Sequence, residues 1–348
     1  GPVKGLPESP VKNPFPNPPR KAFGHLAVSV TMVLWGSTFA ASKILIEHGI
    51  SPLEILIARF TIAWLLMQLI PSPRLGFAGW RRESFFIVAG LGGVTLYFLF
   101  ENTAVSFTYA SNVGLICGIN PLFTAALFWV FYRERPRVWF FVGSALAVFG
   151  IVCVAGNGTE MRMGLVGDLL AVLACLCWSF YTVAIRKIRK MAQGSAVPAS
   201  VGGHAAPDGS DPVSLTGATD EIALTRRVFF WGMVGSLLLV PFSGTADFLR
   251  VGAPLDAWLA PEVLAPLLYL AVLASCLCYA ANNFAMRVIG EVAATSYIYT
   301  LPAISMLASH ILLGEPVTPL AVVGMVAITL GLLVSEEFWK RNQKEARV

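Results

Sequence analysis

The stretch YFLFENTAVSFTYASNVGLICGINPLF at 97–123 has a counterpart 181 residues later, CYAANNFAMRVIGEVAATSYIYTLPAI at 278–304. No gap is needed to align the two copies, and the same offset continues to match beyond them. The coinciding residues are Asn102, Ala104, Pro121, Glu134, Gly143 and Gly150 in the first copy, and Asn283, Ala285, Pro302, Glu315, Gly324 and Gly331 in the second. Because self-similarity at a fixed offset indicates a duplicated structural unit, the sequence predicts two copies of one unit.

Composition places both copies in a membrane. Hydrophobic residues make up 56% of the 348 residues and charged residues only 13%, which excludes an ordinary soluble domain. The apolar runs are continuous rather than alternating, so they predict helices, since only helices and closed barrels satisfy every backbone group in lipid. Runs near the length that a bilayer requires fall at about 24–46, 52–71, 83–106, 108–131, 137–155, 165–187, 225–243, 262–287, 290–313 and 317–335.

Ten runs divide into five per copy. Because five is an odd number, the second copy lies inverted in the membrane relative to the first. We therefore predict an all-α integral membrane protein of ten transmembrane helices, built as two inverted five-helix repeats. The repeats cover 24–155 and 165–335, between a Pro-rich tail at 1–23 and a second tail at 336–348. A segment at about 191–220, rich in Gly, Ala, Ser, Pro and Asp, predicts a disordered cytoplasmic insertion in the second repeat.

The positive residues behind the net charge of +5 indicate how the chain is oriented in the membrane, rather than binding to nucleic acid. With the N-terminus inside, the inner segments hold 21 Lys and Arg residues, whereas the outer loops hold only Arg162 and Arg250. The positive-inside rule then predicts that both termini lie in the cytoplasm.

Neither a cofactor nor a metal is expected. All six cysteines fall inside expected spans, and residues two apart on a helix point about 200° apart, so the Cys-x-Cys pairs at 175–177 and 276–278 cannot share a metal. The four histidines are scattered along the chain, and no Walker-type glycine-lysine loop is present, so ATP hydrolysis by this chain is not expected.

Short motifs in both copies carry a family resemblance. They include WGSTF at 35–39, ENTA at 101–104, NPLF at 120–123, WS at 178–179, NFA at 283–285 and GEP at 314–316. Together and in this order they resemble the ten-span bacterial members of the drug/metabolite transporter superfamily, which consist of two EamA-type repeats. The resemblance covers roughly 24–335 apart from the insertion. It implies a carrier of the bacterial cytoplasmic (inner) membrane, often an exporter of amino acids or related compounds, with a central cavity lined by both repeats, Thr38 among its residues.

Three ionisable residues lie well inside expected spans, namely Lys43, Arg59 and Glu101. Such residues are rare in lipid because each costs about 2.5–3.5 kcal/mol at a helix centre, and those that persist line a cavity or form a pair. All three fall in the outer third of their spans, so we expect a functional cluster in which Glu101 pairs with Arg59 or Lys43. A purely structural ion pair is the alternative. The carboxylate of Glu101 is suited to an amino group of the substrate or to a coupling proton or ion, and its counterpart in the second copy is the uncharged Asn282.

Polar and aromatic residues in the spans complete the expected binding site. Asn102 and Asn283 occupy equivalent places, and helical spacing puts Phe98 beside Asn102, Tyr97 beside Glu101, and Tyr279 beside Asn283. The remaining members are Asn112, which with Asn120 extends the polar side of its span, the matched tryptophans Trp35 and Trp178, and Tyr181 and Tyr299. Hydrogen bonds between helices are the alternative for the asparagines, and a position at the membrane interface is the alternative for the aromatic residues.

Matched prolines predict pivots. Pro121 and Pro302 occupy the same repeat position, and each removes a backbone donor from its span. A static bend is the alternative to a hinge.

The sequence therefore predicts a secondary transporter, and not an enzyme. It would export a small organic metabolite, such as an amino acid or a related amphipathic compound, by alternating access. Its expected partners are the metabolite, the lipid bilayer and a coupling proton or ion. A membrane-embedded enzyme is one alternative, and a channel or a non-transporting membrane scaffold is another.

Overall fold

The computed structural model describes residues 18–77, 79–133, 138–155, 161–194, 218–289, 294 and 297–345, and these residues form helices and loops without a strand. The first repeat contains α1 (Pro18–Glu47), α2 (Pro52–Gln68), α3 (Trp80–Gly90), η1 (Leu91–Leu96), α4 (Tyr97–Phe107), α5 (Ala110–Cys117), α6 (Asn120–Tyr132) and α7 (Val138–Ala155). The second contains α8 (Met161–Gly194), α9 (Ala218–Leu237), α11 (Pro261–Leu268), η4 (Tyr269–Leu277), α12 (Cys278–Ile289), η5 (Tyr297–Thr300), α14 (Leu301–Leu313) and α15 (Pro319–Glu345). The short elements η2 (Val240–Phe242), η3 (Asp247–Leu249) and α10 (Leu255–Leu259) connect α9 to α11.

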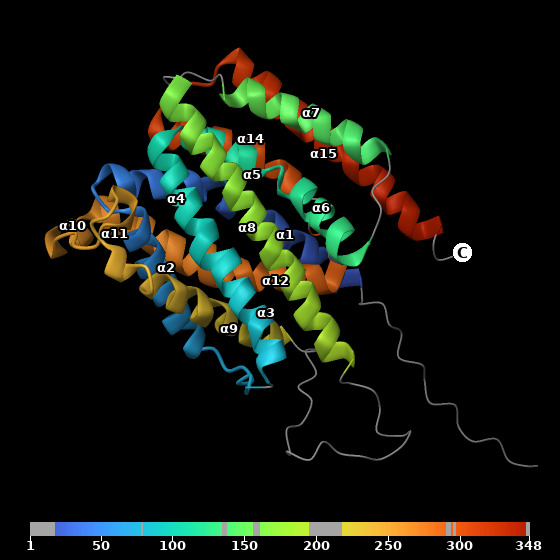
Figure 1. Cartoon of the computed structure of the whole chain (residues 1–348), viewed down its shortest axis with the longest axis horizontal. Coiled ribbons are helices and arrows are strands. Elements are labelled where there is room, and N and C mark those ends of the chain that lie inside the picture. The colour runs from blue at the N-terminus through green and yellow to red at the C-terminus, as the bar shows by residue number, and fades with distance from the viewer. Residues whose placement is uncertain are drawn as a thin grey trace, which may run out of the picture.

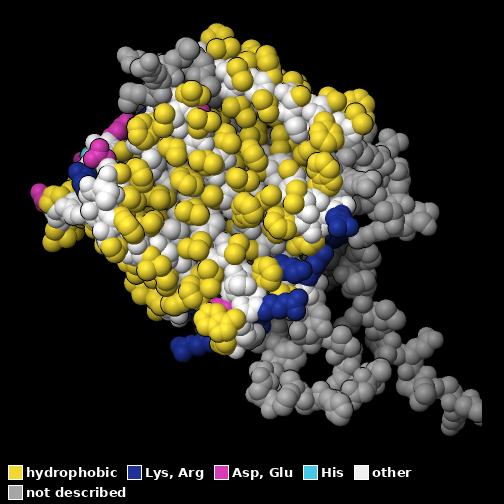
Figure 2. All heavy atoms as spheres, in the orientation of Figure 1, with side chains coloured by type: hydrophobic (Ala, Val, Ile, Leu, Met, Phe, Trp, Pro, Cys, Tyr) yellow, Lys and Arg dark blue, Asp and Glu magenta, His cyan; other side chains and the backbone are white. Residues whose placement is uncertain are grey.

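Six of the helical segments are long and apolar enough to cross a membrane. They are Lys21–Glu47, Trp80–Phe107, Ala110–Tyr132, Gly164–Met191, Glu221–Phe242 and Pro261–Ala285, and three shorter apolar helices, Val138–Cys153, Leu301–Leu313 and Pro319–Gly331, accompany them. Figure 2 shows a broad apolar face, with Lys and Arg gathered at one edge of it and Asp and Glu mostly at the opposite edge. This distribution of side chains suits a protein whose middle lies in lipid.

Several helices extend beyond their apolar runs. The tail expected at 1–23 is helical from Pro18, the insertion expected at about 191–220 is helical as far as Gly194 and again from Ala218, and the tail expected at 336–348 is helical to Glu345. These ends are corrections to the sequence prediction. The reason is that a helix need not end where its apolar run ends, and the Lys, Arg, Gln and Glu residues found there favour helix. The rest of these segments lies outside the described residues.

Two expected spans are interrupted at their prolines. The span expected at 108–131 is divided into α5 and α6 by a turn at Gly118 and Ile119, and Pro121 occupies the first turn of α6. Pro302 likewise occupies the first turn of α14, after the short 3₁₀ helix η5. Proline is tolerated there because the first N–H groups of a helix have no partner within the helix.

Helices α7 and α15 lie side by side along their length (Figure 1). Glycines allow this close approach: a Cβ atom on Gly150 would lie 2.7 Å from the Gly324 carbonyl oxygen, and one on Gly331 would lie 2.5 Å from the Gly143 carbonyl oxygen. The two contacts are reciprocal, since Gly143 and Gly150 coincide with Gly324 and Gly331 at the repeat offset.

Two π-helical segments occupy equivalent places in the repeats. Segment η1 joins α3 to α4, and η4 joins α11 to α12. At the offset of 181 residues, η1 coincides with the last six residues of η4. Single-turn widenings of this kind are rare and are frequent at functional sites. Here each one directly precedes residues that point into the centre of the molecule.

Candidate functional site

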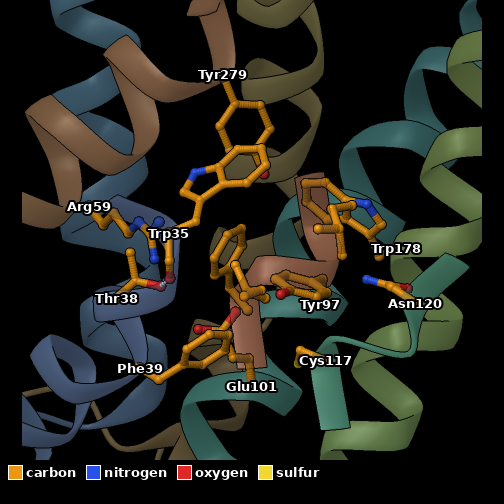
Figure 3. A pocket seen from close by; sticks show the side chains of 13 residues that line it. Trp35, Thr38, Phe39, Arg59, Tyr97, Glu101, Cys117, Asn120, Trp178 and Tyr279 are labelled. Carbon is orange, nitrogen blue, oxygen red and sulfur yellow. Dashed lines mark hydrogen bonds between the residues drawn. The ribbon is translucent and has the colours of Figure 1, made fainter. Parts of the chain in front are cut away.

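A pocket lies at the centre of the helices (Figure 3). Helices α1, α2, α4, α5, α6, α8, α12 and α14 and the 3₁₀ helix η5 supply its lining, which consists of Trp35, Thr38, Phe39, Arg59, Tyr97, Phe98, Glu101, Cys117, Asn120, Trp178, Tyr279, Ile298 and Leu301. The centre of a water molecule has about 50 Å³ of space in this pocket, several times the roughly 10–15 Å³ that one water needs. Both repeats therefore contribute walls to one small cavity.

Aromatic rings form much of the wall. The rings of Trp35 and Trp178, the matched tryptophans of the two repeats, meet edge to face with centroids 5.9 Å apart. Tyr279 packs against Trp35 with a centroid separation of 5.6 Å, and Tyr97 packs against Trp178 at 5.0 Å. Such geometry adds specific attraction to the burial of apolar area and leaves the ring faces free to contact a ligand.

The π-helical segment η4 fixes this wall through its polar groups. Trp35 donates from Nε1 to the carbonyl of Ala274 at 2.9 Å, and Tyr269 donates from its hydroxyl to the Leu34 carbonyl at 2.7 Å. Arg59 donates from Nε to the Ser275 hydroxyl at 2.6 Å. Three contacts thus hold α1 and α2 against the second repeat and set the orientation of Trp35 and Arg59.

Two opposite charges face the pocket, and both are 1% exposed. The Arg59 guanidinium stacks over the ring of Phe98 with its carbon 4.3 Å from the ring centroid, while its Nη1 has no hydrogen-bond partner among the described residues. Glu101 Oε1 is likewise without a partner among them. Figure 3 shows Arg59 and Glu101 on the border of the same space. Since buried polar groups are nearly always satisfied, the free atoms point to a ligand or water between them.

A second polar cluster lies at the start of α5. Glu315, which follows α14, is 5% exposed and accepts hydrogen bonds from Lys43 Nζ at 3.0 Å, from the backbone N–H groups of Ala110 and Ser111 at 2.8 and 3.0 Å, and from the Ser111 hydroxyl at 2.7 Å. Its carboxylate therefore caps α5 from another part of the chain, where the helix N-terminus favours negative charge. Lys43 also donates to the Thr108 carbonyl at 3.1 Å.

The comparisons with known proteins agree with this architecture. The profile of the EamA-like transporter family matches residues 22–156 and 214–335, which together make up well over half of the chain. The chain belongs to the EamA-like transporter family. It is thus a multi-pass membrane protein of the drug/metabolite transporter type, as the sequence motifs indicated.

Relatives of this EamA-like chain are transporters by name. An uncharacterised transporter of Archaeoglobus fulgidus is 24% identical over 89% of this chain and 96% of its own length. A protein of Streptantibioticus cattleyicolor named "probable terminal-alkyne amino-acid exporter" is 22% identical, over 92% of this chain and 95% of its own. A solved crystal structure that covers 94% of this chain and 99% of its own has a TM-score of 0.54 at 16% identity, so it supports the fold alone.

Seven of the predicted site residues of this EamA-like chain line the central pocket: Trp35, Thr38, Arg59, Tyr97, Glu101, Trp178 and Tyr279. Tyr181 lies just behind it, with its ring 4.8 Å from that of Trp178. The aromatic residues of the predicted site whose side chains are described therefore pack against one another at the centre of the helices. The side chain of Tyr299 lies outside the described residues.

Other predicted site residues are absent from the lining of the pocket. Lys43 pairs with Glu315, so its expected pairing with Glu101 is wrong, and Arg59 borders the same space as Glu101 without an ion-pair contact among the described residues. Asn283 donates to the Thr225 hydroxyl at 2.9 Å, a hydrogen bond between helices. The remaining predicted residues outside the lining are Asn102 and Asn112, both buried, and the prolines Pro121 and Pro302.

The sequence prediction of the site missed several residues of this EamA-like chain. Phe39, Cys117, Ile298 and Leu301 line the pocket, but apolar residues in apolar runs carry no signal of their own. Phe98 and Asn120 also line it; the sequence marks both as parts of polar helix faces, without assigning them to the site. Asp168, a buried acid in the run at 165–187, gives a signal of its own, because intramembrane acids are rare.

Proposed function

We propose that this protein is a secondary transporter that exports a small amphipathic metabolite, such as an amino acid, from the cytoplasm by alternating access. The family and the names of the relatives support a transporter, and the name of one relative refers to amino-acid export. The substrate, the direction and the mechanism rest on the geometry of the central pocket and of the two repeats.

The observation that carries the proposal is the pair of free charged atoms in an aromatic pocket. Arg59 Nη1 and Glu101 Oε1 both lack partners among the described residues and border the same cavity. A zwitterion matches this arrangement, since its carboxylate would accept from the guanidinium and its ammonium group would donate to the carboxylate. Trp35, Trp178 and Tyr279 then provide an apolar surface for the rest of the molecule.

Reciprocal contacts support the inverted repeat that alternating access requires. Trp35 touches its mate Trp178, and the glycines of α7 and α15 touch across the repeats in matched pairs. Contacts between equivalent residues are expected along a two-fold axis in the membrane plane. The same symmetry supports ten spans, of which six have a single described helical segment that is long and apolar enough to cross a membrane.

The Lys43–Glu315 ion pair is suited to act as a gate at one end of the pocket. It ties α1 of the first repeat to the end of α14 in the second. In the sequence, the alignment of Trp35 with Trp178 makes Arg186 the counterpart of Lys43. The offset of 181 residues makes Glu134 the counterpart of Glu315. An inverted protein would therefore carry a second basic and acidic pair for the opposite face. Alternating access follows if only one of the two pairs is closed at a time.

The proposed location is the bacterial inner membrane, with both termini in the cytoplasm. The distribution of Lys and Arg along the sequence supports this orientation. In this orientation the Lys43–Glu315 pair faces the periplasm, and its sequence mate faces the cytoplasm.

Counterflow in liposomes tests the proposal. Purified protein is reconstituted, the vesicles are loaded with one unlabelled amino acid at a time, and uptake of the same labelled amino acid is followed. We expect saturable exchange for amino acids with bulky apolar side chains. Glu101→Gln should abolish the exchange and Arg59→Lys should reduce it at least tenfold. Thr103→Ser should retain it, because the Thr103 hydroxyl donates to the Leu99 carbonyl of its own helix and the serine hydroxyl can do the same.

The outcomes separate the competing functions. A channel would pass solute without stoichiometric exchange, and a scaffold would pass none. A membrane-embedded enzyme would convert the labelled compound, which chromatography of the vesicle contents would detect. Exchange that is unaffected by Glu101→Gln and Arg59→Lys would remove the charged pair from the mechanism.

A further inference from the structure

Asp168 is a buried acid that the central pocket does not use. It lies on α8, its exposure is 4%, and neither carboxylate oxygen has a hydrogen-bond partner among the described residues. It is absent from the lining of the central pocket. A carboxylate inside a membrane-spanning helix is costly and marks a path for ions or protons by default. Burial without a partner requires that a cation neutralise it for part of the transport cycle.

Two polar side chains lie next to this part of α8. The Thr108 side chain packs against Gly167, the residue before Asp168, and Asn112 donates from Nδ2 to the Thr108 hydroxyl at 3.2 Å. Asn112 Oδ1 is fully buried and has no partner among the described residues. Gly167 makes the approach possible, since a Cβ atom there would lie 2.8 Å from Thr108 Cγ2 and 2.9 Å from the Ala104 carbonyl oxygen. Asn112 on α5 and Gly167 on α8, the residue before Asp168, thus both contact Thr108 at the end of α4.

No fixed positive charge offsets this carboxylate in the described part of the chain. Lys43 is the cation near Thr108, and it is engaged by Glu315. The other titratable or charged side chains around this cluster are Tyr109 beside Lys43, and His310, which contacts the Glu315 carbonyl. The helices packed against α8 add a further set, namely Glu83, Arg81 and Arg82 on α3, Tyr97 and Glu101 on α4, Cys117 on α5, Tyr132 on α6 and Cys153 on α7.

We propose that Asp168, Thr108 and Asn112 form a binding site for the coupling proton, separate from the site for the metabolite. A proton fits this donor set better than an alkali-metal ion. The side chains supply few oxygens, one of which already accepts from Asn112 Nδ2, whereas hard metal ions take about six oxygen ligands. When a proton binds a carboxylate oxygen of Asp168, the new O–H group can donate to Thr108 Oγ1, which Asn112 Nδ2 holds in place. Release on the other side of the membrane restores the carboxylate, so the cycle conserves the proton.

Thr108 connects this site to the ion pair at the end of the pocket. Its side chain packs against Gly167, the residue before Asp168, and its carbonyl accepts from Lys43. A change in charge at Asp168 therefore acts on the residue that also holds the lysine of the Lys43–Glu315 pair. This placement lets proton binding bias the opening of that pair, which is the coupling that proton-driven export requires.

The inference rests on the proposed transport function, and the test separates the two. Reconstituted protein is assayed for exchange without a gradient and for accumulation driven by an imposed pH gradient. For Asp168→Asn, which mimics the protonated acid, we expect at least tenfold loss of pH-driven accumulation, while exchange continues at a tenth or more of the wild-type rate. Glu101→Gln should lose both activities. Asp256→Asn, at an exposed position in α10, serves as the matched control and should lose neither.

The remaining arms make the proposal refutable. Thr108→Val keeps the carboxylate of Asp168 but removes the neighbouring hydroxyl. We expect this variant to shift the pH at which driven transport is half-maximal. Gel filtration in detergent shows whether Asp168→Asn folds, and the Thr108→Val result remains informative if it does not. A sodium gradient should drive no accumulation. Driven transport that survives in Asp168→Asn, a pH profile unchanged in Thr108→Val, or accumulation driven by sodium would each overturn the proposal. Absence of exchange in the wild type would instead count against the transport function itself.

Discussion

Replacement of Glu315 by Ala should destabilise the protein more than replacement of Lys43 by Ala. Glu315 accepts four hydrogen bonds, of which Lys43 provides one. Without Glu315, two backbone N–H groups of α5 and the Ser111 hydroxyl lose their acceptor and the lysine loses its counter-charge. Without Lys43, whose side chain is 17% exposed, the carboxylate keeps its three bonds to the start of α5.

The expected magnitudes follow from these contacts. A lost cap costs about 0.5–2 kcal/mol, and a hydrogen bond to a charged group contributes about 1.5–3 kcal/mol. Glu315→Ala should therefore lower the free energy of unfolding by about 3–5 kcal/mol, which also matches the cost of breaking a buried ion pair. Lys43→Ala should lower it by about 1.5–2 kcal/mol. The double variant should cost about 1–2 kcal/mol less than the sum of the two single changes, because the contact is lost only once.

Unfolding of the purified protein in detergent micelles, titrated with denaturant, measures all four free energies. Glu262→Ala is the control, since Glu262 is an exposed acid in the first turn of α11. Equal losses for the two single variants, or additivity within about 0.5 kcal/mol, would refute the assignment of Glu315 as a cap that pairs with Lys43.

Three further predictions follow from the described contacts. Gly150→Ala should reduce the yield of folded protein in gel filtration, because its Cβ would meet the Gly324 carbonyl at 2.7 Å, whereas Gly76→Ala, with open space around it, should not. Arg59→Lys should leave folding intact but lower the rate of exchange at least tenfold. An ammonium group cannot donate to Ser275 in the same geometry and also present a free planar N–H group to the pocket. An unchanged Michaelis constant and an unchanged rate of exchange would contradict the role of Arg59. Reporter fusions should place both termini in the cytoplasm, and termini on opposite sides of the membrane would overturn the inverted repeat of five and five.

The helices could be predicted from the sequence because lipid leaves the backbone no other partner than itself. The depth of a residue in the membrane followed from the same runs, which is how Arg59 and Glu101 were assigned to one site. Trp35 and Trp178 were assigned to it as matched aromatic residues of the two repeats. Lateral neighbours could not be predicted in this way. Lys43 lies in the expected outer third, yet its partner comes from the turn after α14, because α1 and α14 pack together. Asn283 similarly faces α9 rather than the pocket.

The sequence shows prolines at positions 121 and 302, but it does not show that a helix ends and a new one begins there. A proline inside a run predicts a local loss of one hydrogen bond. The structure starts a new helix at each site instead, so that both prolines fall in a first turn where nothing is lost. Local sequence does not distinguish a kink from a restart, because the difference depends on neighbours such as Gly118, where a Cβ atom would lie 2.5 Å from Pro302 Cγ.

The matched π-helical segments determine the direction in which the side chains of the following helices point toward the pocket. A π-helical turn holds about one residue more than an α-helical turn, and successive residues of an α-helix are rotated by about 100°. If Leu91–Leu96 were wound as an α-helix without the loss of a residue, Tyr97, Phe98 and Glu101 would rotate away from the cavity together. Because η4 precedes Tyr279 in the same way, straightening one segment alone would change the orientation of the residues on one side of the cavity and not of those on the other.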